Sequence, residues 1–269
     1  MCRAGTPIVL PRQVRIACLG PSRLNGAGMA RLLKISRPNS KKGFPYRLAW
    51  LLSRAIIWFV VISVGLTILF RFVPVPVTIT MMMDPNGITK DWTPLSRIDR
   101  NMAAAVIAGE DSKFCQHNGF DREAIENAME RNAKGGKLRG GSTISQQTAK
   151  NVFLWQGSGW DRYLRKGLEA WFTFLIENLW GKRRIMEVYL NVAETGIGTY
   201  GVEAGAQRYY KHSASRLSPV EAARIAAALP SPKKRAVNNA KGFTRRHGNT
   251  IAARSRVVRN SALDACIYE

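Results

Sequence analysis

Apolar and polar residues follow a helical period along most of this chain. Between Asp99 and Glu110, apolar side chains recur every three or four positions. The segment 162–180 carries a longer apolar stripe, made of Leu164, Leu168, Phe172, Leu175 and Leu179. The same period predicts further helices at residues 124–133, 143–154, 182–193, 202–210 and 219–229. Hardly any segment alternates with the period of two that a half-buried strand requires, so we expect a mainly α domain.

Short polar motifs mark where two of these helices begin. Thr143 with Gln146, and Ser218 with Glu221, have the spacing of a capping box, in which each side chain bonds the backbone N–H of the other residue. Two prolines soon after residue 229 end the last predicted helix. From residue 233 the chain is basic and polar, so we expect 233–269 to be either part of the domain or disordered.

One segment is apolar enough to cross a membrane. Residues 55–70 are uncharged, and with their apolar neighbours they reach the roughly 20 residues that a bilayer-spanning helix needs. A cleaved signal peptide is the alternative, but the apolar run is long and no small-residue cleavage site follows it. We therefore predict a transmembrane helix at 49–73, a connector at 74–97 and a globular domain at 98–232.

Charge predicts the orientation of this helix. Residues 1–48 contain ten Lys or Arg and no Asp or Glu, which favours a cytoplasmic N-terminus and a globular domain on the outer, periplasmic side of the inner membrane. Met29 precedes a basic stretch of the kind that commonly comes before a membrane helix, and it is an alternative first residue of the protein. The remaining chain carries a net charge of +13. A tethered basic domain meets anionic membrane lipids and lipid diphosphates, and no nucleic-acid motif is present.

Four cysteines are too few to predict a disulfide scaffold. Cys2 and Cys18 would face the cytoplasm, where thiols stay reduced. Cys115 and Cys266 would share the outer compartment, so a bridge between them is open, but the sequence favours free thiols.

A glycine turn before a predicted helix is the first candidate site. Gly140 and Gly141 allow close backbone approach, and the following capping box opens a helix whose first amides would face an anion. Lys150 would add a positive charge at the same place. A diphosphate group fits this pattern, although a plain helix start has the same residues.

The run from Glu110 to Asp121 favours a diphosphate site over a plain helix start. Its acidic pair, Phe114 and the His-x-Gly-Phe-Asp string resemble the first motif of the peptidoglycan glycosyltransferases, and 140–147 resembles their second, with Ser145 where Thr is usual. The third and fourth motifs are similar to 165–169 and 182–191. The resemblance runs from about residue 71 to 232 and is greatest to the monofunctional, biosynthetic members. It implies a lysozyme-like fold after the transmembrane helix.

The resemblance also implies roles for individual residues. Glu110 matches the base that deprotonates the acceptor sugar, and Glu169 matches a second carboxylate beside the leaving diphosphate. Without the resemblance, Glu110 reads as a solvated or salt-bridged helix end, and Glu169 as an intrahelical ion pair. The expected diphosphate contacts are Ser142, Gln146, Gln147, Lys150, Arg162 and Arg165. The residues expected to be structural near the site are Asp111, Phe114, His117 and Asp121.

The third motif departs from the family pattern. Members usually carry an Arg four residues before Arg165, where this chain has Asp161 followed by Arg162. Either Arg162 reaches the same phosphate across an inserted loop, or the contact is lost. The neighbouring apolar residues either dip into the bilayer beside a polyprenyl substrate or pack in the core. They are Val152, Phe153, Leu154, Trp155 and Trp160.

These expectations define an inverting enzyme that polymerises lipid II into β-1,4-linked glycan strands and releases undecaprenyl diphosphate. Its expected partners are lipid II, the nascent strand, membrane lipids and other wall-synthesis and division proteins. A weakly held divalent cation, Mg²⁺ or Mn²⁺, is the expected cofactor, with no organic group. The alternatives are a lysozyme-like hydrolase or lytic transglycosylase, and an inactive membrane-anchored scaffold of the wall-synthesis complex.

The charge asymmetry predicts the topology of the chain. An alkaline phosphatase fused after Glu269 should be active, because this enzyme folds only outside the cytoplasm and the positive residues hold the N-terminus inside. The control is the same fusion with the ten basic residues before the helix replaced by Gln. A C-terminus protected from protease in intact spheroplasts would contradict the orientation.

Overall fold

The structure is a computed structural model that describes residues 43–133, 141–157 and 159–268. The interpretations of Met29, Cys2, Cys18 and Gly140 fall outside these ranges, as does most of the basic N-terminal segment. The chain forms two compact units, Met1–Trp58 and Phe59–Glu269. Helix α2 (Phe44–Phe72) begins in the first unit and ends in the second.

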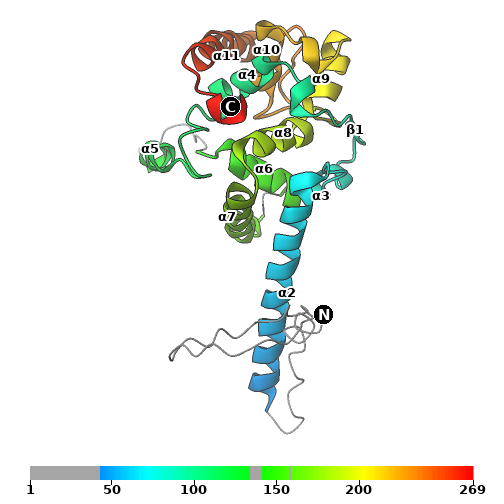
Figure 1. The fold of residues 1–269 in the computed structure, drawn as a ribbon, viewed down its shortest axis with the longest axis vertical. Coiled ribbons are helices and arrows are strands. Elements are labelled where there is room, and N and C mark those ends of the chain that lie inside the picture. The colour runs from blue at the N-terminus through cyan, green and yellow to red at the C-terminus, as the bar shows by residue number, and fades with distance from the viewer. Residues whose placement is uncertain (1–42, 134–140, 158, 269) are drawn as a thin grey trace, which may run out of the picture. The chain divides into compact units, whose positions relative to one another are not determined.

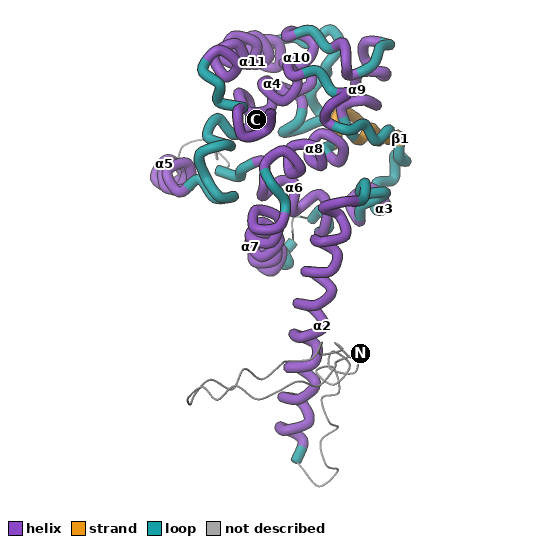
Figure 2. Tube along the Cα trace, in the orientation of Figure 1, coloured by secondary structure: helices purple, strands orange, loops and turns teal. Residues whose placement is uncertain are grey.

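Helices make up most of the second unit, which confirms the mainly α prediction (Figures 1 and 2). Each predicted helix is present, and its ends agree within two residues. These helices are α4 (Arg100–Glu110), α5 (Arg122–Ala133), α6 (Ile144–Phe153), α7 (Arg162–Leu179), α8 (Lys182–Val192), α9 (Val202–Tyr210) and α10 (Pro219–Ala228). Both capping boxes form as predicted, at Thr143 with Gln146 and at Ser218 with Glu221.

Several elements were not predicted from the hydrophobic periodicity. The strands β1 (Thr89–Lys90), β2 (Glu194–Gly196) and β3 (Thr199–Tyr200) are too short to alternate, and they form one sheet in the order β1-β3-β2. β1 pairs with β3 in parallel, and β2 pairs with β3 antiparallel. The remaining elements are the helices α3 (Ile79–Met82), α11 (Gly242–Asn260) and α12 (Ala265–Tyr268) and the 3₁₀ turns η1 (Leu95–Arg97) and η2 (Ala214–Arg216).

Helix α4 lies at the centre of the core. Every residue from Met102 to Ala108 is buried, so the helix has protein on all sides. Helices α10 and α11 pack against it, and the alanines of α10 allow close approach. Ile251 and Val258 carry the buried face of α11. The segment after residue 233 therefore folds against the helix that carries Glu110.

The end of α2 is bonded to two helices of the domain. The Trp171 indole N–H of α7 donates to the Ser63 hydroxyl at 3.1 Å, and the Trp180 indole N–H donates to the Thr67 carbonyl at 2.7 Å. Arg184 of α8 donates to the carbonyls of Phe70 and Val73. By length and composition, α2 is the one helix among the described residues that could cross a membrane.

Two glycines with similar backbone angles allow the packing of the first motif to be tested. Gly119 has φ +88°, and a Cβ there would lie 2.7 Å from Thr173 Cγ2, whereas Gly87 has φ +80° and open space around it. We expect Gly87→Ala to cost about 1 kcal/mol of unfolding free energy through backbone strain alone. Gly119→Ala should cost about 1–3 kcal/mol more, because of overpacking.

Denaturant unfolding of both variants in detergent, followed by circular dichroism, measures this difference. Equal destabilisation by the two substitutions would mean that the loop around Gly119 relaxes freely and is not held against α7.

Candidate active site

Glu110 is the last residue of α4 and is partly buried. Its Oε2 accepts a hydrogen bond from the Gln147 amide of α6 at 2.9 Å, and the Gln147 oxygen accepts one from the Tyr189 hydroxyl of α8 at 3.1 Å. Burial raises the pKa of the Glu110 carboxyl, and the Gln147 bond opposes that rise. The expected position at the end of a buried helix is confirmed, and three motifs meet at this carboxylate.

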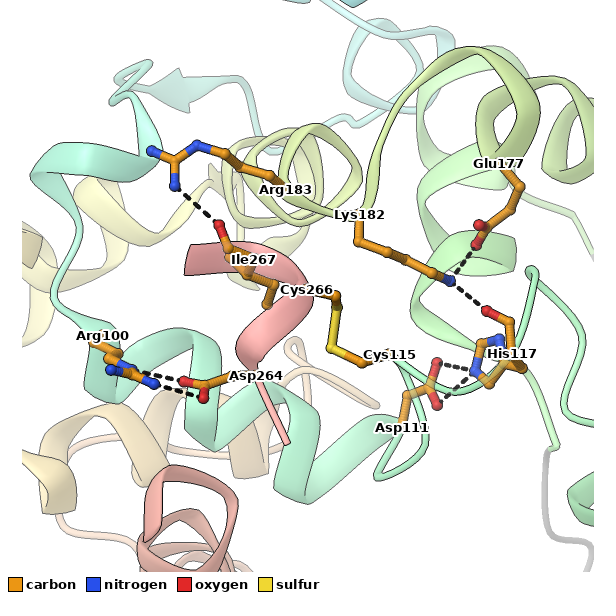
Figure 3. Close-up of a disulfide and its surroundings, with 10 residues drawn as sticks. All are labelled: Arg100, Asp111, Cys115, His117, Glu177, Lys182, Arg183, Asp264, Cys266 and Ile267. Carbon is orange, nitrogen blue, oxygen red and sulfur yellow. Dashed lines mark hydrogen bonds and ion pairs between the residues drawn. A yellow bond between two sulfur atoms is a disulfide. The ribbon is translucent and has the colours of Figure 1, made fainter. Parts of the chain in front are cut away.

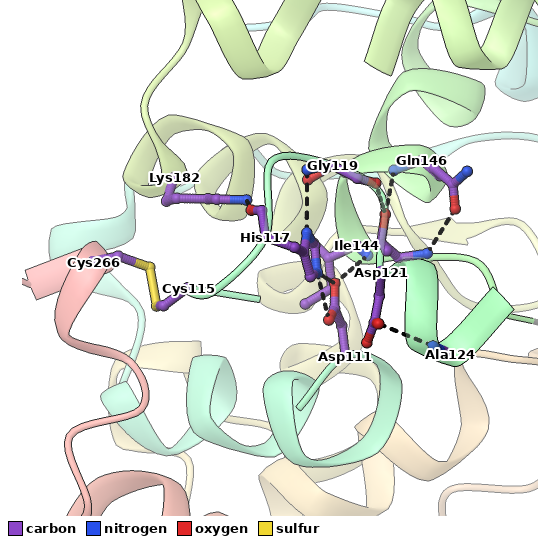
Figure 4. Close-up of polar contacts among 12 residues, drawn as sticks. Asp111, Cys115, His117, Gly119, Asp121, Ala124, Ile144, Gln146, Lys182 and Cys266 are labelled. Carbon is purple, nitrogen blue, oxygen red and sulfur yellow. Dashed lines mark hydrogen bonds and ion pairs between the residues drawn. A yellow bond between two sulfur atoms is a disulfide. The ribbon is translucent and has the colours of Figure 1, made fainter. Parts of the chain in front are cut away.

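Asp111 connects the first two motifs (Figure 4). Its carboxylate contacts His117 Nε2 at 2.9 Å and accepts from the backbone N–H of Ile144 at 3.0 Å. The N–H of Gly119 donates to His117 Nδ1, so the ring proton lies on Nε2 and is donated to Asp111. The buried carboxylate is thus compensated by two donors that lie far apart in the sequence.

A second set of polar contacts links His117 to the second and fourth motifs. Lys182, the first residue of α8, donates to the His117 carbonyl and to Glu177, each at 2.7 Å. Glu177 also accepts a hydrogen bond from Ser145, the residue that stands in place of the usual threonine. The Lys182 ammonium lies 4.6 Å from the centre of the buried Phe114 ring.

Asp121 lies at the edge of this arrangement. It accepts from the Ala124 N–H at 2.9 Å and so caps α5. These contacts hold the first-motif loop in place through Asp111, His117 and Asp121.

The start of α6 differs from the sequence interpretation. The amides expected to face an anion are already bonded, since Ile144 N–H donates to Asp111 and Gln146 N–H donates to Thr143. The Gln146 side-chain oxygen is also occupied, by the N–H of Thr143. A buried carboxylate therefore occupies the position at the helix N-terminus that a diphosphate was expected to take.

Positive charge gathers further along α6 instead. Lys150 lies in the last turn of that helix, in the electrostatic field of Glu169 and Arg165 from α7 and of Glu110. Burial lowers the pKa of its ammonium, and the two carboxylates oppose that shift. Glu169 is only 6% exposed and is paired with Lys166. The structure thus brings together Glu110, Lys150, Arg165 and Glu169.

Two of the expected phosphate contacts, Ser142 and Arg162, are exposed. Arg162 is exposed at the start of α7 and its guanidinium stacks on the Tyr163 ring at 5.1 Å. Ser142 is also exposed. Asp161, which replaces the usual arginine, accepts a hydrogen bond from the Trp155 indole at 2.6 Å and so fixes the loop before α7.

The apolar residues before α7 divide between core and surface. Val152 and Leu154 are buried, and Phe153 stacks on Phe172 at 4.3 Å between ring centres. Trp160 is 87% exposed. The residues 152–154 therefore pack in the core, whereas Trp160 lies on the surface.

One relevant residue was missed by the sequence reasoning. Arg235, after the last predicted helix, donates to the Ala227 carbonyl at 2.8 Å, and its charge lowers the pKa of Glu110 against the effect of burial. No local pattern marks it, because it acts across the fold from a segment without periodicity.

The residues near Glu169 do not form a metal cage. Within the described ranges, no group of three His, Cys, Asp or Glu side chains converges in a way that could hold an ion. Glu169 is itself paired with Lys166.

Comparison with known proteins assigns the family. Residues 78–257 match the model of the family described as Transglycosylase, which extends past residue 232 into α11. A protein of Caulobacter vibrioides named biosynthetic peptidoglycan transglycosylase is 50% identical over 203 residues, covering 74% of this chain and 87% of the relative. Proteins of the same name from Bdellovibrio bacteriovorus and Pseudomonas putida are 47% and 50% identical, covering 79% and 68% of this chain and 84% and 80% of the relatives. Three of the four motifs meet at Glu110, and the chain belongs to the transglycosylase family.

Proposed function

We propose that the chain joins lipid-linked disaccharides with Glu110 as general base and with Lys150 and Arg165 beside the leaving diphosphate. Membership of the family makes it a peptidoglycan transglycosylase, a glycosyltransferase of cell wall synthesis, and lipid II and the glycan strand are its substrates. The observation that carries the residue assignment is that Glu110 of α4 and Lys150 of α6, both partly buried, act electrostatically on each other, while Glu169 and Arg165 of α7 act on the same lysine.

Glu110 fits the role of base for a physical reason. A sugar hydroxyl is a weak acid, so its proton must be taken as the new bond forms, and the base works best when its pKa approaches the working pH. Burial raises the pKa of Glu110 in that direction. Gln147, which Tyr189 orients from α8, holds one carboxylate oxygen and leaves the other for the acceptor 4-hydroxyl.

The leaving group needs positive charge on the other side of the reacting carbon. In the proposed step the acceptor oxygen attacks the anomeric carbon of the growing strand, Glu110 takes the proton, and the bond to the diphosphate oxygen breaks. Undecaprenyl diphosphate departs, and the configuration at the anomeric carbon inverts. Lys150 and Arg165 would stabilise the charge that develops on the diphosphate, and Glu169 would hold the two cations apart and aligned.

The exposed surface of α7 supports a membrane-bound substrate. Tyr163, Leu164 and Phe174 are each more than half exposed on this helix, and Trp160 precedes it. Trp171 of the same helix is bonded to α2. We propose that these side chains lie in the headgroup region on the periplasmic side of the inner membrane, where a polyprenyl chain enters.

A divalent cation has a limited place in this proposal. With no group of three His, Cys, Asp or Glu side chains converging among the described residues, a Mg²⁺ or Mn²⁺ ion would take most of its ligands from diphosphate and water. The proposed glycosyl transfer does not require this ion. Proteins of wall synthesis and division remain proposed partners, recruited to a domain held at the membrane.

The lytic and scaffold alternatives are less well supported. Cutting a glycan strand needs one acidic carboxyl but no cationic pocket for a diphosphate. A scaffold needs neither Glu110 nor Lys150. Incubation of the detergent-solubilised protein with labelled lipid II separates the polymerase from both alternatives, because only a polymerase yields lengthening strands.

The base assignment predicts the effect of Glu110→Gln. The amide keeps the shape and the Gln147 contact but cannot take a proton, so polymerisation should fall by at least about 10²-fold while lipid II binding persists. In the wild type, the raised pKa of Glu110 means that protonation removes the base at a higher pH than for an ordinary glutamate. The rate should therefore fall on acidification before the pH reaches the usual carboxyl range.

Rates of polymerisation across pH, with binding measured separately, test this assignment. Near-normal turnover by Glu110→Gln, with folding verified by circular dichroism, would remove Glu110 from the mechanism.

The cation assignment predicts different effects for two residues of the expected phosphate site. Lys150→Ala should lose a charge-assisted contact of about 1.5–3 kcal/mol, roughly tenfold to a hundredfold in kcat/KM for lipid II. Arg162→Ala should change this constant less than about threefold, because the guanidinium stacks on the exposed Tyr163 ring. A large loss in Arg162→Ala would show that the arginine turns to the substrate after binding.

A further inference from the structure

The C-terminal helix α12 is covalently joined to the first-motif loop. Cys266 of α12 forms a disulfide with Cys115, 151 residues earlier in the chain (Figure 3). The sequence favoured free thiols, so this expectation is wrong. Cys115 lies five residues after Glu110 and between Asp111 and His117.

The same short segment also holds the other end of α4. Asp264 is fully buried, and its two carboxylate oxygens accept from Nε and Nη2 of Arg100 at 2.8 and 2.7 Å. Arg100 is the first residue of α4, and its guanidinium lies 4.9 Å from the centre of the Tyr268 ring. The backbone carbonyl of Ile267 accepts a further bond from Arg183 of α8 at 2.9 Å.

The segment 264–268 is therefore bonded to the first residue of α4 and to the loop that follows its last residue. The helix is about 16 Å long, with Arg100 at one end and Glu110 at the other. An ion pair fixes the first residue, and the disulfide fixes the loop that leaves the last. Neither contact touches the site itself.

The loop held by the disulfide reaches the site through Asp111. As Figure 4 shows, the carboxylate of Asp111 joins His117 to the first amide of α6. The same helix carries Gln147, whose side-chain amide donates a hydrogen bond to Glu110. A displacement of Cys115 would be transmitted along this chain of hydrogen bonds. Catalytic constellations lose rate steeply when their geometry loosens.

We propose that the Cys115–Cys266 disulfide positions Glu110 and the α6 wall for catalysis, and that the chain becomes fully active only after this bond has formed. The two cysteines act as positioning residues, because neither contacts the reacting atoms. This inference rests on the proposed role of Glu110.

The bond forms by exchange with a disulfide of an oxidising partner. One cysteine thiolate attacks the partner disulfide, and the second cysteine then displaces the partner, which leaves as a dithiol with the two electrons and two protons. Such partners belong to oxidising compartments. In the reduced chain, the Arg100–Asp264 pair and the buried Ile267 still hold α12, so the fold persists while the loop gains freedom.

The test compares oxidised and reduced forms of the same full-length protein in detergent. Dithiothreitol reduces the bond and is itself oxidised to a cyclic disulfide, and alkylation followed by mass measurement verifies two free thiols. We expect kcat for lipid II polymerisation to fall by about tenfold with a smaller change in KM. The acid limb of the pH profile should move toward that of an ordinary glutamate, as Glu110 becomes better solvated.

Matched variants separate positioning from simple stability. Cys115→Ser/Cys266→Ser should have the low kcat of the reduced wild type and no response to reductant. Reoxidation with oxidised glutathione should restore only the wild type. Circular dichroism at the assay temperature monitors folding in every sample.

Two outcomes would overturn the inference. Unchanged kcat and pH profile in the verified reduced protein would show that the Cys115–Cys266 disulfide does not position Glu110. A rate loss that merely follows the unfolded fraction would reduce the disulfide to a stabilising link. If the oxidised protein fails to polymerise lipid II, the proposed function fails instead.

Discussion

The compensation of one buried negative charge underlies the arrangement of this domain. Asp111 is 7% exposed, and an ionised carboxylate with that little contact with water is costly unless donors surround it. His117 and the first amide of α6 supply these donors, and the positive end of the α6 dipole adds to them. Satisfying Asp111 therefore brings α6 to the end of α4, and Gln147 then meets Glu110 as a consequence of that contact.

The helices that could be predicted from sequence are those whose ends are determined locally. The Thr143 and Ser218 capping boxes and the apolar stripe of α7 depend on residues within a few positions of one another, and the structure contains all three. Hydrogen-bond partners that lie far apart in the sequence could not be predicted. The Ile144 amide donates to a carboxylate 33 positions away, and the Tyr189 hydroxyl donates to Gln147, 42 positions away. Periodicity contains no information about either choice.

The C-terminal segment shows how composition can hide a pattern. The residues of α11 buried against the core are Gly248, Ile251, Ser255 and Val258, which have helical spacing, but two of them are too small or polar to register as an apolar stripe. The many arginines on its exposed face made the segment look unfolded. The cysteine pairing was likewise outside the reach of sequence reasoning, because 151 residues separate the partners and no spacing rule connects them.

The bonds between the end of α2 and the domain have a mechanical consequence. Indole and guanidinium groups of α7 and α8 hold the Ser63 hydroxyl and backbone carbonyls at Thr67, Phe70 and Val73. These bonds make residues 63–73 one rigid body with α7 and α8. A force on this end of α2 is therefore transmitted directly to the two helices that carry the third and fourth motifs, without an intervening flexible linker.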